Sequence, residues 1–154
     1  MQEIIDIHSK GEYPANVLSN FYPRDNFVYD GIKIASAESF LQSLKFKNPK
    51  KQIKICALDA KTAKKKGSKK FLWKITGNVY WKGKKWKRLE DSYMFLIYNF
   101  YIQMHIQDDT FAIALNKTGT KTLIHSIGKH DKRKTILTEK EFIDTLEQLR
   151  AFCL

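Results

Sequence analysis

The sequence is poor in the features that mark secreted and membrane proteins. Only two of its 154 residues are cysteine, Cys56 and Cys153, and without a C-x-x-C spacing they indicate neither a disulfide framework nor a zinc site. No apolar run reaches the roughly 18 residues of a membrane span, and the first residues lack the basic region, apolar run and cleavage site of a signal peptide. We therefore expect a cytoplasmic protein in a reducing environment, without membrane contact.

Acidic residues are also scarce. Asp and Glu number 16 against 28 Lys and Arg, and the net charge of +12 favours an anionic partner such as nucleic acid, a nucleotide or an acidic protein. The segment 61–90 holds twelve Lys or Arg and one acid, Glu90, with Trp73, Trp81 and Trp86 interleaved. A solvated surface is the simplest interpretation, but aromatic rings beside cations can also stack a base while holding phosphate, so this segment is a candidate nucleic-acid contact.

Several enzyme signatures are missing as well. The chain has no G-x-x-x-x-G-K-[ST], G-x-G-x-x-G or H-E-x-x-H motif and no nucleophile elbow, and its four histidines are scattered. We expect neither a metal nor a cofactor. A hydrophobic content of 43%, without internal repeats or linkers, predicts one domain with a single core.

Periodicity and turn residues predict an α+β domain with more helix than strand. A hairpin is expected at Asp30-Gly31, because both residues tolerate positive φ. Residues 17–23 read as an ordered loop. The remaining predicted elements are strands at 3–7 and 120–125 and helices at 36–46, at 52–57, from Asp59 to Gly67, at 89–107, from Asp108 or Asp109 to near Gly119, and from the capping-box residue Thr138 onward.

The helix that follows the hairpin carries an unusual polar stripe. Ser36 can cap its first turn, and Glu38, Gln42 and Lys45 are spaced i, i+4, i+7, so they share one face. Spacing alone favours an exposed face with a weak ion pair. The alternative is a face that lines a pocket, with an acid, an amide and an amine pointing the same way.

Three motifs in order resemble those of the NADAR (NAD and ADP-ribose, YbiA-like) family. They are Ser19-Asn20-Phe21, Asp30-Gly31 and the run S-A-E-x-F-x-Q-x-x-K-F from Ser36 to Phe46. The resemblance is clearest over residues 17–125 and continues through Ala63 to Gly67, Trp86 with Met94, and Leu115 to Leu123. It implies a single helix-rich α+β domain over residues 1–154, with a small antiparallel sheet or hairpin.

The resemblance also implies an activity. The family is associated with cleavage of N-glycosidic bonds, in ribosylamino intermediates of riboflavin synthesis or in ADP-ribose attached to guanine. By position, Glu38 is similar to the catalytic glutamate and Lys45 to the lysine that reacts with the anomeric carbon. A carboxylate can stabilise the oxocarbenium character of the breaking bond, and a lysine with a lowered pKa can form a Schiff base. The substrate-binding residues expected from position are Asn20, Phe21, Gln42, Trp86, His125 and Asp131.

The chain departs from the family after residue 124. His125 stands where the family has a glutamate, and the basic segment from Gly128 to Lys134 replaces a W-G motif, with Asp131 as the candidate stand-in for an acidic residue. The alternative function is therefore a catalytically weak or inactive module that binds NAD, ADP-ribose or nucleic acid. A third is a basic nucleic-acid-binding protein with ancestral resemblance only. The oligomeric state is left open.

Overall fold

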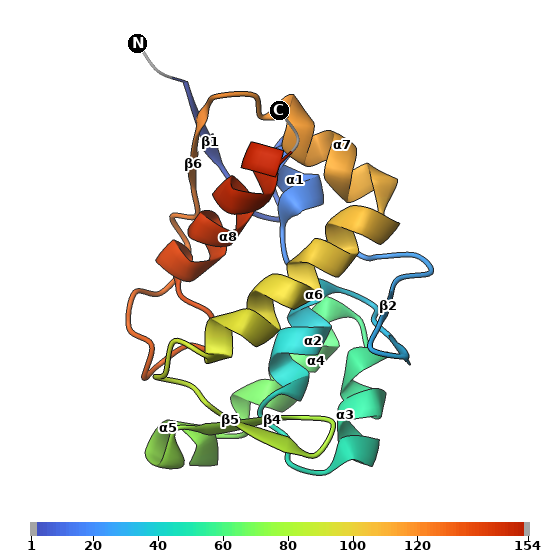
Figure 1. Ribbon diagram of the computed structural model, residues 1–154, viewed down its shortest axis with the longest axis vertical. Coiled ribbons are helices and arrows are strands. Elements are labelled where there is room, and N and C mark those ends of the chain that lie inside the picture. The colour runs from blue at the N-terminus through green and yellow to red at the C-terminus, as the bar shows by residue number, and fades with distance from the viewer. Residues whose placement is uncertain (1–2, 153–154) are drawn as a thin grey trace.

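A computed structural model describes residues 3–152, in which helices dominate and short strands occur in pairs (Figure 1). Cys153 lies outside the described residues, whereas Cys56 is buried as a free thiol. The elements in chain order are β1 (Ile4–Asp6), α1 (Ala15–Leu18), β2 (Val28–Tyr29), β3 (Ile32–Lys33), α2 (Ala37–Ser43), α3 (Pro49–Cys56), α4 (Ala60–Ser68), α5 (Leu72–Thr76), β4 (Asn78–Trp81), β5 (Lys84–Lys87), α6 (Tyr93–Gln107), α7 (Asp109–Lys117), β6 (Thr122–Ile124) and α8 (Glu139–Phe152).

The helix-rich α+β class is confirmed, and the strands of residues 3–152 form three separate two-stranded pairs. The hairpin β2–β3 turns at Asp30 and Gly31, whose φ angles of 51° and 79° are those the turn requires. A second antiparallel hairpin, β4–β5, turns at Lys82 and Gly83 in the same way. The third pair is parallel and joins β1 to β6, with Ile4 opposite Thr122. The sheet content is thus two hairpins and one parallel pair.

Several boundaries differ from the sequence prediction, and helix α5 and the hairpin β4–β5 were not predicted. Helix α4 continues past Gly67 to Ser68, and Gly67 packs closely against Gln42 of α2. Residues 15–18, expected within and just before a loop, form the short helix α1. Helix α6 begins at Tyr93 instead of Leu89, since residues 89–92 form turns that lead into it.

Helix α6 crosses the middle of the molecule and supplies much of the core (Figure 1). Phe100 stacks on Phe40 of α2 with ring centroids 4.0 Å apart, and Tyr29 packs edge-on against both rings. Trp73 and Trp81 are buried, only 3% and 5% exposed, so they belong chiefly to this core. Within residues 3–152 no helix combines the length and apolarity needed to cross a membrane.

Candidate functional site

A pocket of about 330 Å³ lies between the loop 19–21, helices α2 and α4, and the segment that follows β6. Its wall includes six of the residues singled out from the sequence. They are Asn20, Phe21, Glu38, Gln42, Lys45 and His125. The polar stripe of α2 therefore faces a pocket, and the simpler interpretation of an exposed face is wrong.

Local hydrogen bonds fix how α2 meets the pocket. Ser36 is the N-cap of the helix, because its Oγ accepts a bond of 3.1 Å from the amide of Ser39. The amide of Glu38 donates to the carbonyl of Asn20 at 2.9 Å, which ties the loop to the first turn of the helix. The side chain of Asn20 is held in turn, since its Oδ1 accepts from the hydroxyl of Tyr101 on α6.

The carboxylate of Glu38 is buried and held on one side. Glu38 is 9% exposed, and Gln42 Nε2 donates to its Oε1 at 2.7 Å, one helical turn away. Among the described residues nothing donates a hydrogen bond to Oε2. A buried carboxylate with one oxygen anchored and one left over can accept a proton or stabilise positive charge on a ligand.

Lys45 completes the stripe as an amine of unusual character. Its pKa is lowered to about 8, chiefly by burial; Glu38 acts in the opposite direction, and the nearby ammonium groups of Lys74, Lys129 and Lys64 contribute to the lowering. Its Nζ also lies 5.5 Å from the ring centroid of Trp73. Near neutral pH a useful fraction of this amine is therefore unprotonated, as a nucleophile must be.

The rest of the wall is cationic and partly aromatic. Five further lysines line the pocket, against one carboxylate among its described lining residues, that of Glu38. The half-buried ring of Phe21 lies 5.3 Å from Nζ of Lys64, so a flat surface and a cation occur side by side. Such a wall suits an anionic ligand that carries a ring. The five lysines are Lys64, Lys70, Lys74, Lys129 and Lys134.

His125, at the end of β6, reaches the pocket in a fixed orientation. Its Nδ1 lies 2.6 Å from the carbonyl oxygen of Ile7, and since a carbonyl only accepts, Nδ1 carries the hydrogen. The ring packs edge-on against Phe142, and a Cβ at Gly128 would come within 2.6 Å of its Cδ2. Nε2 is thus left for contact with a ligand or for proton transfer.

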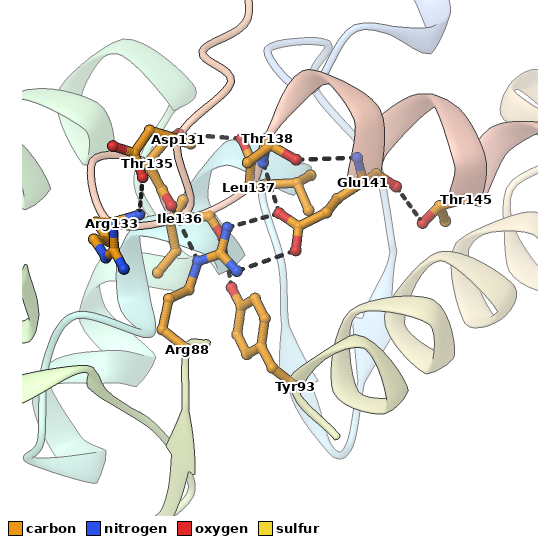
Figure 2. A network of polar contacts seen from close by, with 10 residues as sticks. All are labelled: Arg88, Tyr93, Asp131, Arg133, Thr135, Ile136, Leu137, Thr138, Glu141 and Thr145. Atoms are coloured by element: carbon orange, nitrogen blue, oxygen red, sulfur yellow. Dashed lines mark hydrogen bonds and ion pairs between the residues drawn. The ribbon is translucent and has the colours of Figure 1, made fainter. Parts of the chain in front are cut away.

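A buried ion pair holds the far wall in place (Figure 2). Arg88 donates to both carboxylate oxygens of Glu141, at 2.6 and 3.1 Å, and its Nε donates to the carbonyl of Thr135 at 3.0 Å. The hydroxyl of Tyr93 donates to the carbonyl of Ile136 at 2.7 Å. Because Thr135 and Ile136 line the pocket, this network fixes one of its sides.

The sequence did not identify Arg88, although it did predict the capping box that contains its partner, Glu141. The predicted capping box is confirmed: the amide of Thr138 donates to Glu141 Oε1 at 2.8 Å, and the amide of Glu141 donates to Thr138 Oγ1 at 3.1 Å. The same carboxylate also receives Arg88. No local sequence pattern predicts this ion pair, because the two residues are 53 positions apart.

Trp86 and Asp131 lie outside this pocket. Trp86 is opposite Val79 in the β4–β5 hairpin, and its ring lines a separate hollow beside α6. Asp131 is exposed, and its carboxylate accepts from the amide of Arg133 at 2.9 Å within the loop. The strand register and the loop turn therefore direct these two side chains away from Glu38, and the structure gives neither of them a place in the pocket.

Replacing Gly67 by alanine should disturb the hold on Glu38. An added Cβ would lie 1.8 Å from Oε1 of Gln42, so the amide must rotate away and release its bond to the carboxylate. We expect a loss of about 1–2 kcal/mol in the free energy of unfolding, measured with urea, because overpacking outweighs the better helix propensity of alanine.

The control is the same change in a chain that already carries Gln42→Ala. There only the contact to Cβ of residue 42, at 3.0 Å, remains, so the cost should be smaller by about 1 kcal/mol. Equal costs in both backgrounds would show that Gln42 is not what Gly67 makes room for.

Comparison with known proteins gives three likenesses. A family model described as bacteriophage protein GP30.3 matches residues 12–151. An uncharacterized 17.1 kDa protein from the Gp30-rIII intergenic region of Enterobacteria phage T4 is 37% identical over 149 residues, which cover 95% of this chain and 96% of that protein. The NMR structure of E. coli YbiA matches with a TM-score of 0.66 at 18% identity, covering 99% of this chain and 86% of YbiA. The last likeness confirms the expected YbiA-like fold.

Proposed function

The chain belongs to the bacteriophage GP30.3 protein family and has a YbiA-like fold, and from this premise we propose that it hydrolyses the N-glycosidic bond of a ribosylated or ADP-ribosylated base. The observation that carries the proposal is the meeting of a buried carboxylate, Glu38, and a lysine with a lowered pKa, Lys45, in one pocket. The resemblance of the sequence to the NADAR family implies the same pair of residues.

The two side chains divide the work. The neutral amine of Lys45 forms a bond to C1 of the ribose while the bond from C1 to the base nitrogen breaks, and the base leaves with the electron pair and takes up a proton. Glu38 stabilises the oxocarbenium character at C1 and acts as a general acid and base. Water then replaces the lysine nitrogen at C1, which releases the sugar and restores the amine. His125 Nε2 faces the same pocket as a further proton carrier.

The cationic wall favours the ADP-ribosylated alternative. A diphosphate brings more negative charge than the single phosphate of a ribosylamino intermediate, and the lysines of the wall would stabilise it at low cost. The ring of Phe21, with Lys64 beside it, offers a surface on which a base can stack. ADP-ribosylguanine fits these groups best, as a free nucleotide or within nucleic acid.

The test is release of ADP-ribose from an oligonucleotide that carries ADP-ribosylated guanine, followed by chromatography. We expect turnover by the unchanged protein and a loss of at least about 100-fold in Lys45→Met, because the nucleophile is removed. Lys117→Met, which removes an exposed lysine of α7 outside the pocket, should be as active as the unchanged protein. Comparable release by Lys45→Met and the control would contradict the assignment.

The pH dependence of the same assay has a defined sign. Only the unprotonated amine attacks, and the pKa of Lys45 is about 8, so kcat/KM should rise about tenfold per pH unit below pH 8 and level off above it. At the ordinary lysine pKa of about 10.4, the rise would continue to the highest pH tested. A flat profile between pH 6 and 9 would exclude Lys45 as the nucleophile.

One observation favours a second candidate, a module that binds ADP-ribose without turnover. His125 stands where the NADAR family has a glutamate, and Lys129 and Lys134 make the adjoining wall basic, so an acidic wall is replaced by groups that attract phosphate. Binding of ADP-ribose in titration calorimetry, together with the absence of product after long incubation with the substrate, would support a binding module and not an enzyme.

A further inference from the structure

A second hollow, of about 640 Å³, lies between the β4–β5 hairpin and helix α6. None of its lining residues belongs to the pocket of Glu38. Its surface is formed largely by aromatic side chains, above all Trp86 and Phe95. Phe95 is 75% exposed, so a large apolar ring stands in water beside an open concavity.

Strand register and helix periodicity bring these groups together. In the hairpin Val79 lies opposite Trp86, and Trp81 opposite Lys84, so Trp86 and Lys84 share the face that packs toward α6. On α6, Phe95 and the exposed Asn99 are one turn apart, so they lie on the same side of the helix. The β4–β5 hairpin and α6 thus each place an aromatic ring and a polar side chain at the hollow.

The cations at this hollow differ in how free they are. Lys82 is paired with Asp30, because its Nζ lies 3.3 Å from Oδ1 and donates to the carbonyl oxygen at 2.9 Å. Lys84 has no carboxylate partner among residues 3–152, and its Nζ lies 4.2 Å from the ring centroid of Trp86. Lys85 and Lys87 follow on the outer face of the same strand. Lys84 is therefore the cation that β5 places at the aromatic surface, while Lys85 and Lys87 point to the opposite face of the strand.

We propose that this hollow binds single-stranded nucleic acid, with one base stacked on Trp86 or Phe95 and the adjoining phosphate held by Lys84. A phosphate attracts the Lys84 ammonium away from the Trp86 ring, which frees that face for the base. Lys85 and Lys87, on the opposite face of β5, add positive charge that attracts the phosphate backbone at longer range. The nucleic-acid contact expected in the lysine-rich segment 61–90 is thereby placed at the β4–β5 hairpin. It does not depend on turnover at Glu38.

Polar groups at the rim agree with a base as the occupant. Asn99 donates through Nδ2 to the hydroxyl of Tyr29 at 3.3 Å, which leaves its Oδ1 as an acceptor for an amino group on a base edge. An acidic peptide would match the charge equally well, but its carboxylates have no π-face to place on the rings of Trp86 and Phe95. The combination of the exposed ring of Phe95 and the half-buried ring of Trp86 with the cation of Lys84 thus favours a polynucleotide.

The test is fluorescence anisotropy with a labelled oligo(dT), comparing alanine variants at two exposed phenylalanines. Phe95→Ala should weaken binding about tenfold, since one stacking contact is lost. Phe71→Ala, at a ring 64% exposed outside the hollow, should bind as the unchanged protein does. Both side chains are exposed, so neither change should affect folding. Equal affinity of the two variants would overturn the proposal.

Two further measurements separate this site from a general basic surface. Lys84→Met should reduce the slope of log K against log salt by about 0.7, as one phosphate contact is lost, while Lys69→Met should leave it unchanged. Quenching of tryptophan fluorescence by oligo(dT) should fall to a small fraction in Trp86→Phe, since Trp73 lies outside the hollow and Trp81, at its wall, is only 5% exposed. Competition by poly-glutamate as effective as that by oligo(dT) of equal charge would overturn the proposal in favour of an acidic protein partner.

Discussion

Replacing Arg88 by methionine should lower the free energy of unfolding by about 3–5 kcal/mol, the largest loss of stability we expect from a single change. The guanidinium and the Glu141 carboxylate are only 1% and 9% exposed. Without Arg88 the carboxylate stays buried with no opposite charge, and the carbonyl of Thr135 loses its donor. Urea unfolding, followed by circular dichroism, measures the effect.

The matched comparison removes both partners. Arg88→Met with Glu141→Leu should recover part of the loss, because apolar side chains of similar volume replace a pair that is costly to desolvate, while the Thr138 amide loses its bond to Glu141. Lys140→Ala, which breaks the exposed pair with Asp144, should change stability little. If the double variant is no more stable than Arg88→Met alone, the loss does not come from the stranded charge.

The ion pair also predicts how stability depends on pH. Burial raises the pKa of Glu141, but the bonds from Arg88 and from the Thr138 amide outweigh it, and the net pKa is lowered. The stabilisation is therefore present above the ordinary carboxyl pKa of about 4.3 and is lost as the pH falls through the lowered value. In Arg88→Met the bond that lowers this pKa is gone, so acid should destabilise the variant less.

The second large effect is on activity: Glu38→Gln should lower kcat/KM by about 10²- to 10⁴-fold. Glutamine has the same shape, and its oxygen can still accept the 2.7 Å bond from Gln42 Nε2. What it lacks is the negative charge that stabilises the developing cation at C1 and the ability to take up a proton. ADP-ribose affinity should change by less than about tenfold, because the lysines that hold the phosphates are untouched.

The control for this change is Glu147→Gln, an exposed glutamate of α8 far from the pocket in sequence and absent from its lining. It should have the activity of the unchanged protein, and both variants should unfold at the same urea concentration within error. A Glu38→Gln variant that retains more than about a tenth of the activity would rule out the carboxylate as a catalytic group.

Local features were predictable from the sequence. The hairpin at Asp30-Gly31 follows from turn chemistry, and the caps Ser36, Asp59 and Asp108 mark helix starts that the structure confirms. Periodicity also placed Glu38 and Lys45 on one face. These signals act within a few residues, where backbone geometry and side-chain hydrogen bonding leave few options.

What could not be predicted depends on contacts between distant segments. The parallel pairing of β1 with β6 has no turn to announce it, and a three-residue strand carries almost no periodicity. Trp86 was grouped with Glu38 by family position, yet the β4–β5 register turns it toward α6. Gly67 looked like a helix end, although its function is to admit the side chain of Gln42.

The bond between His125 and Ile7 joins residues 118 positions apart, and this separation bears on how the protein is made. During translation the segment before α2 leaves the ribosome long before β6 is synthesised, so β1 stays unpaired until then. Helices α2 and α4 are close in sequence and can pack early. The side of the pocket that His125 lines forms only after the last quarter of the chain has been synthesised. A nascent chain therefore carries Glu38 and Lys45 well before it carries a complete pocket, and binding competence should appear in one late step.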